Sequence, residues 1–259
     1  MKRFASSILL IASMVAIAKP SFAATENTAI SPAERAKIET VVHDYLLKNP
    51  QIIIEVMQIL QRNQADQAQQ TVKLTQKAAP SFANALFHQA SDPMAGNPKG
   101  AVTVVEFFDY QCPHCVDMAP VMASIIKANP NLRVIYKEFP IRGAVSEFAA
   151  RAALAANLQG KYDAFSHALL TSNKPLSEAV IFEIATANGL DINKLKSDME
   201  SNAIKNQVKA TIKLAQDLKL FGTPALFVGK TSAAGKEPIT YIPGRADQPQ
   251  LQNMIDQVK

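Results

Sequence analysis

Cysteine is scarce in this chain of 259 residues, which has only Cys112 and Cys115. A zinc site needs about four ligands, and two cysteines with scattered histidines do not supply them. Haem attachment requires a histidine directly after the second cysteine, and Val116 stands there instead. We therefore expect no metal site and no cofactor.

Long apolar runs are also lacking. The apolar run Ile8–Ala18 has about 11 residues, whereas a membrane-spanning helix needs about 20. It follows Lys2-Arg3 and precedes the small-x-small sequence Ser21-Phe22-Ala23, which is typical of a cleavable signal peptide. We expect residues 1–23 to be removed and the mature chain to be exported as a soluble protein.

Excess basic charge is lacking as well. The formal net charge of +5 falls to +2 when Lys2, Arg3 and Lys19 leave with the signal peptide. Nucleic-acid binding requires a concentrated basic patch or stripe. Nucleic acid is therefore not an expected partner.

The two cysteines form one motif, Cys112-Pro113-His114-Cys115, which follows the apolar β-type run 102–108. Apolar residues then recur at helical spacing, so Cys112 is expected at a helix N-terminus, where free N–H groups and the helix dipole stabilise a thiolate. A structural disulfide is the alternative, but it would close too short a loop to stabilise the fold much. The motif therefore predicts thiol–disulfide exchange.

The region after the signal peptide predicts two amphipathic helices. Ser31-Pro32-Ala33-Glu34 has the sequence of a capping box, and Asn49-Pro50 separates the first helix from the second. Residues 61–77 are polar, which predicts a polar helix or a connecting arm. Two such helices cannot build a core of their own. We expect residues 24–78 to form a homodimer, with a trimer and an extension laid across the main domain as alternatives.

Residues 79–259 predict one α/β domain. The content of proline and glycine in 78–100 predicts a linker. Strand-like runs at 102–108, 132–139, 225–228 and 239–242 surround helical patterns, which fill 144–218 and close the chain at 248–258. The order strand, helix, strand, helical block, strand, strand, helix predicts a thioredoxin-like fold with a helical insertion at about 144–218.

The domain resembles the DsbA family of exported thiol–disulfide oxidoreductases. The resemblance lies in Glu106-Phe107-Phe108, in the Pro113-His114 dipeptide between the cysteines, and in Gly222-Thr223-Pro224-Ala225, which is similar to the family's cis-proline loop. The N-terminal helices and Thr223 are more similar to the oligomeric subgroup that includes ScsC. Threonine before the proline is also similar to the DsbC and DsbG isomerases.

Roles follow for the motif residues. Cys112 is the expected nucleophile because it is the first cysteine and the nearest to the exposed helix end, and Cys115 is expected to be buried and to resolve mixed disulfides. His114 is expected to stabilise the thiolate. The resemblance implies that Glu106 is a buried acid near Cys115 with Lys137 as its partner; the alternative is a side chain that reaches solvent.

Substrate and location follow mainly from the resemblance. Thr223 and Pro224 are expected to form a cis peptide and bind an extended substrate beside Cys112. The predicted protein oxidises or isomerises disulfides of periplasmic proteins and works with a membrane redox partner of the DsbB or DsbD type. Two alternatives are a binding protein or antigen of the envelope, with possible outer-membrane association, and a Cu(I)-binding thiol protein.

Overall fold

The computed structural model describes residues 30–258, which divide into two units between Leu60 and Gln61. The predicted signal peptide, residues 1–23, lies outside the described residues. Within them, no helix is both long and apolar enough to cross a membrane.

The first unit consists of helix α1 (Pro32–Lys48) and the first ten residues of helix α2 (Gln51–Ala78). The predicted capping box begins α1, because the Ser31 backbone N–H donates to the Glu34 carboxylate at 2.9 Å and the Glu34 N–H donates to the Ser31 hydroxyl. No residue of α1 is buried. The large apolar side chains that the two helices expose in this unit are Ile38, Val41, Val42, Tyr45, Leu47, Ile53, Ile54, Val56, Met57, Ile59 and Leu60.

The C-terminal end of α2 belongs to the second unit. The buried Thr75 hydroxyl donates to the carbonyl of Leu218 at 2.7 Å. Gln76 accepts the N–H of Tyr241 and donates to the carbonyl of Ile239, so one side-chain amide pairs with an edge strand as a neighbouring strand would. The last turns of α2 therefore help to hold the sheet.

The second unit is built on a five-stranded mixed sheet in the order β1-β3-β2-β4-β5. The strands are β1 (Met94–Gly96), β2 (Val102–Phe108), β3 (Leu132–Glu138), β4 (Ala225–Lys230) and β5 (Ile239–Pro243). Strands β2 and β3 are parallel, and the other neighbours are antiparallel. Every residue of β2, and every residue of β4 except Lys230, is buried because both faces of the sheet are covered.

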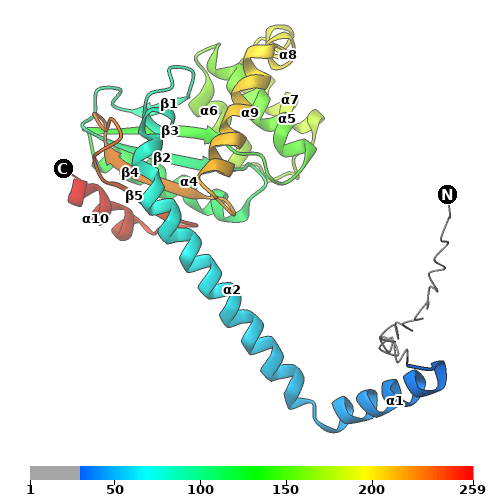
Figure 1. Ribbon diagram of the computed structural model, residues 1–259. Helices are drawn as coiled ribbons and strands as arrows, with labels where there is room; N and C mark the ends of the chain where they lie inside the picture. The colour runs from blue at the N-terminus through cyan, green and yellow to red at the C-terminus, as the bar shows by residue number, and fades with distance from the viewer. Residues whose placement is uncertain (1–29, 259) are drawn as a thin grey trace, which may run out of the picture. The chain divides into compact units, whose positions relative to one another are not determined.

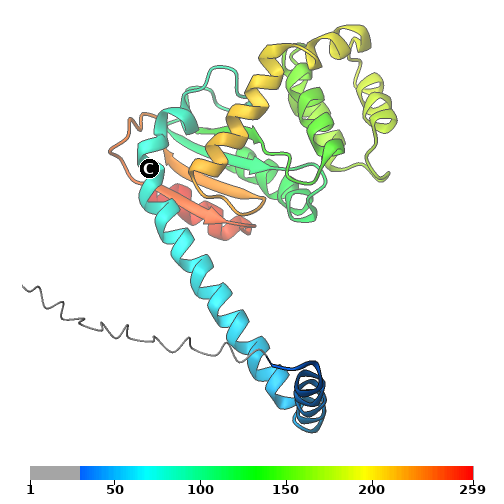
Figure 2. The ribbon, with the colours of Figure 1, turned by 45° about the vertical axis from the view of Figure 1, so that its right-hand side comes forward.

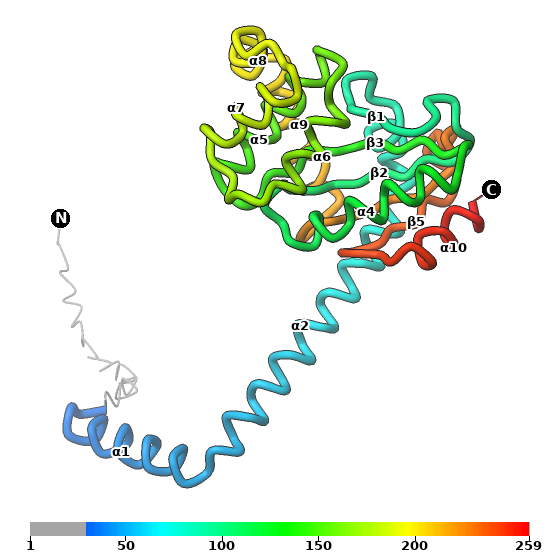
Figure 3. Tube along the Cα trace, turned by 180° about the vertical axis from the view of Figure 1, so that it is seen from behind, coloured from blue at the N-terminus to red at the C-terminus, as the bar shows by residue number. Residues whose placement is uncertain are grey.

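Helices cover both faces of this sheet. Helices α4 (Pro113–Ala128) and α10 (Gln248–Val258) lie on one face, in front in Figure 3. The other face carries the short helices η1 (Ala79–Phe82) and α3 (Ala83–Phe87) and helix α9 (Asn202–Asp217), which lies in front of the sheet in Figure 1. Successive residues of β2 alternate between these two layers.

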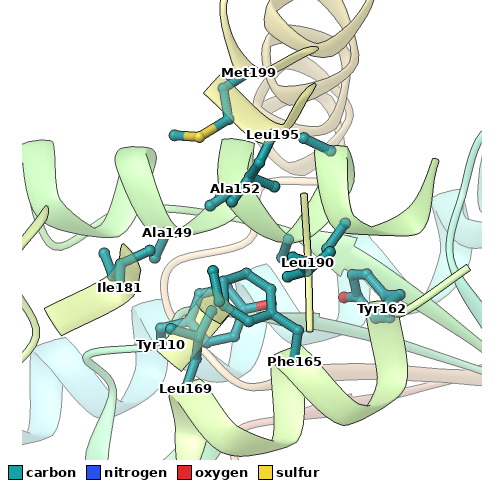
Figure 4. Packing of buried hydrophobic residues seen from close by; sticks show 14 of the residues in the cluster. Tyr110, Ala149, Ala152, Tyr162, Phe165, Leu169, Ile181, Leu190, Leu195 and Met199 are labelled. Carbon is teal, nitrogen blue, oxygen red and sulfur yellow. The ribbon is translucent and has the colours of Figure 1, made fainter. Parts of the chain in front are cut away.

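A helical block lies between β3 and β4 at one end of the sheet (Figure 2). Besides α9 it contains α5 (Ala144–Asn157), α6 (Tyr162–Leu170), α7 (Glu178–Ala187) and α8 (Ile192–Met199). Alanines of α5 pack with Phe165 and Leu169 of α6 in a buried cluster that also receives Tyr110 and Tyr162 (Figure 4). The predicted thioredoxin-like fold with a helical insertion is confirmed.

The prediction of a linker at 78–100 was wrong. The segment forms η1, α3 and β1, and Ala79, Leu86 and Phe87 are buried against the sheet. Pro80 lies within η1 and Gly96 ends β1, whereas Pro93 and Pro98 lie in the short connections on either side of β1.

Candidate active site

Cys112 lies at the N-terminus of α4, as the sequence predicts. Its extended backbone (φ −86°, ψ 116°) makes it the N-cap, and Pro113 occupies the first turn, where its missing N–H costs nothing. The carbonyl of Cys112 accepts the N–H groups of Cys115 at 2.9 Å and Val116 at 3.1 Å. The strand-to-helix turn thus places both cysteines at the free N–H end of the helix.

The two thiols are free, and both are buried at 1% exposure. Burial works to raise the pKa of Cys112, but contacts with Thr223 and with the backbone N–H groups of Cys115 and His114 outweigh it and lower the pKa below its ordinary value. Burial raises the pKa of Cys115 far above its ordinary value, and the charges of Glu106 and Cys112 add to this. Cys112 is therefore the better thiolate of the pair.

The loop before β4 lies against Cys112. The Thr223–Pro224 peptide is cis. The Cys112 thiol donates to the carbonyl oxygen of Thr223 at 3.2 Å. The Thr223 side chain lowers the pKa of both thiols, and its hydroxyl oxygen is buried without a hydrogen-bond partner among the described residues.

The side chain of His114 is 66% exposed, and its Nδ1 lies 4.0 Å from the carboxylate of Asp117. The contribution of His114 to the Cys112 thiolate comes from its backbone N–H. Stabilisation of the Cys112 thiolate by the His114 imidazole stays a prediction.

Glu106 is buried in β2 at 4% exposure, which rules out the alternative of a side chain in solvent. Burial raises its pKa to about 8, and the charge of Cys112 contributes. Glu106 in turn raises the pKa of Cys115, so the carboxyl and this thiol interact. A carboxyl with this pKa can hold or release a proton near neutral pH.

Lys137 is not the partner of Glu106. In the register of β2 and β3, Glu106 faces Tyr136, whereas Lys137 faces Phe107 on the opposite side of the sheet. The Lys137 ammonium forms a buried ion pair with Asp92 and donates to the carbonyl of Ala85 at 2.7 Å. Alternation along β3 directs this side chain away from the thiols, and spacing in the sequence does not reveal the register that decides it.

Asp109 is a site residue that the sequence did not reveal. Its buried carboxylate accepts four hydrogen bonds, from the Ser146 hydroxyl and from the N–H groups of Gln111, Ile141 and Arg142, at 2.8–3.0 Å. These contacts fix the turn before Cys112 to the start of the helical insertion. An aspartate directly after a buried strand is the only signal in the sequence, and it is a weak one.

The comparison with protein families agrees with this geometry. The model of the DSBA-like thioredoxin domain matches residues 103–256. The chain belongs to this family, a family of thiol–disulfide oxidoreductases. The model of the copper resistance protein ScsC N-terminal domain matches residues 34–67, which cover most of the first unit.

Individual relatives support the assignment to the DsbA-like family. The thiol:disulfide interchange protein DsbA of Bordetella parapertussis is 30% identical over 145 residues, which cover 53% of this chain and 68% of that protein. A thioredoxin-like oxidoreductase from Silicibacter pomeroyi is 41% identical, with a TM-score of 0.62 over 67% of this chain and 95% of that structure. Salmonella enterica Typhimurium BcfH is 33% identical, with a TM-score of 0.64 over 87% and 96%.

About half of the chain also matches part of some larger proteins. The Na(+)/H(+) antiporter NhaA 1 of Mycolicibacterium gilvum is 30% identical over 142 residues. This chain spans 23% of the length of that antiporter.

Proposed function

We propose that this DsbA-like protein is an exported thiol–disulfide oxidoreductase that forms and isomerises disulfide bonds in proteins of the periplasm. The observation that carries the proposal is the asymmetry of the cysteine pair. The environment of Cys112 lowers its pKa, whereas burial raises that of Cys115. One sulfur is therefore suited to attack and to leave, and the other to resolve.

The reaction with a substrate disulfide takes two exchange steps. The Cys112 thiolate attacks one sulfur, forms a mixed disulfide and releases the first substrate thiolate. Cys115 then attacks the Cys112 sulfur, its proton passes to the Glu106 carboxylate, and the second substrate thiolate leaves. The substrate gains two electrons and the Cys112–Cys115 disulfide forms. Substrate oxidation is the reverse, with protonated Glu106 returning its proton to the Cys115 thiolate.

Thr223 and Pro224 form the proposed substrate-binding edge. The Thr223 carbonyl is within hydrogen-bond distance of the Cys112 sulfur. An extended peptide that pairs with the backbone of Thr223 would thus bring its own sulfur to Cys112, in the manner of strand addition.

The first unit is the proposed dimerisation region. Its two helices expose eleven large apolar side chains, from Ile38 to Leu60, which is far more than scattered surface residues account for. A homodimer that covers them presents two cysteine pairs to one misfolded substrate, which favours isomerisation. A trimer through the same surface is the alternative, and a membrane protein of the DsbB or DsbD type is the proposed redox partner.

Reactivation of scrambled ribonuclease in glutathione buffer tests this function. The mature chain is compared with a version that lacks residues 24–60, a cut chosen because Thr75 and Gln76 belong to the second unit. If the mature chain reactivates the ribonuclease and the shortened chain only oxidises thiols, the first unit is required for isomerisation. If both only oxidise thiols, isomerisation is excluded.

Point variants test the proposed dimer surface without deleting a segment of the chain. Ile53→Glu with Met57→Glu places charge on the exposed apolar surface of α2 and is expected to give a monomer by light scattering. The matched control, Gln64→Glu with Gln67→Glu, adds the same charge to a polar part of the helix. An unchanged mass of the first variant would contradict the proposed dimer surface.

Copper binding is a second candidate, because residues 34–67 match a domain named for copper resistance. Two thiolates are suitable ligands for Cu(I). Among residues 30–258, no cluster of three or more histidine, cysteine or acidic side chains is suited to hold a metal. Titration of the reduced protein with Cu(I), with Cys112→Ser as control, tests binding by the thiols alone.

A further inference from the structure

Two buried carboxyls lie on the same face of the sheet. Glu106 of β2 faces Tyr136 of β3, and Phe108 of β2 faces Glu138, so Glu138 is one step further along the same side. Glu106 and Glu138 are only 4% and 2% exposed. The rings of Phe108 and Tyr136 meet edge to face at 5.9 Å within this layer. The two carboxyls therefore share a buried environment with aromatic neighbours.

Glu138 is the centre of a hydroxyl network. Its Oε1 accepts hydrogen bonds from Tyr110 at 2.9 Å and from Tyr162 at 2.7 Å, and the Ser166 hydroxyl is 3.1 Å from the Tyr110 oxygen. Its other oxygen, Oε2, is buried without a partner. Tyr110 precedes Cys112 by two residues, whereas Tyr162 and Ser166 belong to α6. The network thus connects the active-site turn with the helical insertion.

The basic side chains of β3 do not neutralise the charge of Glu138, because both lie on the opposite face of the sheet. Arg133 donates to the Thr103 hydroxyl and the Phe87 carbonyl, and Lys137 forms an ion pair with Asp92. Burial raises the pKa of Glu138 to about 8; the two tyrosine hydroxyls oppose this shift, and the charges of Asp109 and Glu106 add to it. The titratable groups around Glu138 are Tyr110 and Asp109 from the turn, Glu106 from β2 and Tyr162 from α6.

We propose that Glu138 is a positioning residue for proton transfer at Cys115, because it forms a coupled pair with Glu106 that avoids carrying two negative charges. This inference rests on the proposed exchange reaction. When Glu138 is protonated, Glu106 can ionise and take the proton of Cys115. When Glu138 carries the charge, Glu106 holds its own proton more tightly. The pair then titrates in two steps that belong to both residues.

The pairing has a consequence for the rate of resolution. Between the two steps the pair carries a single negative charge, and only the share held by Glu106 serves as a base for Cys115. Glu138→Gln leaves the whole charge on Glu106, so in this pH range resolution should be faster than in the wild type.

The reaction of the reduced full-length protein with dithiobis(nitrobenzoate), called dithionitrobenzoate below, has two phases, and the second phase measures the attack of Cys115. The first nitrothiobenzoate leaves when Cys112 forms the mixed disulfide, and the second leaves when Cys115 resolves it. We expect the rate of the second phase to rise with pH in two steps in the wild type and in one step in Glu138→Gln. A profile that Glu138→Gln leaves unchanged overturns the proposal.

Two comparisons separate coupling from structural damage. Asp92→Asn removes a buried carboxyl from the opposite face, and it is expected to lower stability without changing the shape of the profile. In the unmodified protein, the side-chain carbon-13 signal of Glu106 should titrate in two steps, which tests coupling even if Glu138→Gln folds poorly. A single-step titration contradicts the pair. Failure to reactivate ribonuclease would count against the proposed function and not against the pair.

Discussion

The Cys112 thiol and the carbonyl oxygen of Thr223 are 3.2 Å apart, although 111 positions separate them in the chain. The contact joins the N-terminus of α4 to the loop that enters β4, so the reactive sulfur and the proposed substrate-binding edge form one surface. The side chain of Thr223 also interacts with both thiols. Residue 223 is therefore placed to adjust the chemistry of the pair as well as substrate binding.

Thr223→Val should raise the pKa of Cys112. The change keeps the size and branching of the side chain but removes the hydroxyl that stabilises the thiolate. Thiolate absorbance or the pH dependence of alkylation measures the shift. Thr186→Val, which removes an exposed hydroxyl from the end of α7, is the control and should leave the titration of Cys112 unchanged. If Cys112 titrates in Thr223→Val as it does in the wild type, the Thr223 hydroxyl does not stabilise the Cys112 thiolate.

Cys115→Ala should trap mixed disulfides that Cys112→Ser cannot form. Cys112 retains its position at the helix N-terminus and attacks the substrate, but the sulfur that would resolve the product is gone. The reduced variant is mixed with a model peptide that contains a disulfide, and non-reducing gels and mass spectrometry detect the adduct. If the adduct formed through Cys115 in the Cys112→Ser variant instead, the assignment of nucleophile and resolving thiol would be reversed.

The motif and its immediate surroundings could be predicted because they depend on local patterns. Cys112-Pro113-His114-Cys115 lies between an apolar strand and a periodic helix, and the capping box at Ser31 and Glu34 spans one helical turn. Thr223-Pro224 was found through resemblance, and the cis geometry agrees with it. Such features do not depend on which strand lies beside which.

The contacts of the buried charges could not be predicted because they depend on strand register. Alternation identified the strand at 132–139, yet the partners of Lys137 and Glu138 follow from how β3 aligns with β2 and which layer each residue faces. Lys137 was therefore assigned to the wrong carboxylate. Glu138 carried no signal of its own until Tyr110 and Tyr162, 28 and 24 residues away, were seen to converge on it.

Lys137→Met should destabilise the protein without changing the exchange chemistry. It leaves Asp92 buried without its cation, and breaking a buried ion pair in this way costs about 3–5 kcal/mol. The double variant Lys137→Met with Asp92→Asn removes both charges and should recover part of the loss. Urea unfolding measures the free energies, and the resolution assay should give the wild-type pH profile for any variant that remains folded. A changed pH profile would show that Lys137 takes part in the exchange reaction.

Glu106→Gln should make the protein more stable at alkaline pH and slower in resolution. The pKa of Glu106 rises from 4.5 in the unfolded chain to about 8 in the folded one. Between these values the folded state binds more protons, so the free energy of unfolding falls as pH rises, by up to about 1.4 kcal/mol per pH unit for this carboxyl. Glutamine removes that loss of stability, but it leaves Cys115 without its proposed proton acceptor.

Two measurements on Glu106→Gln test this trade-off together. Urea unfolding at pH values from about 5 to about 8 should show a shallower fall in stability than in the wild type. The second phase of the dithionitrobenzoate reaction should be slower near pH 8 and should keep rising with pH, because only the strongly raised pKa of Cys115 then limits it. Glu178→Gln, at an exposed position in α7, is the control for both. A stability gain with an unchanged resolution rate would leave Glu106 as a buried acid that takes no proton from Cys115.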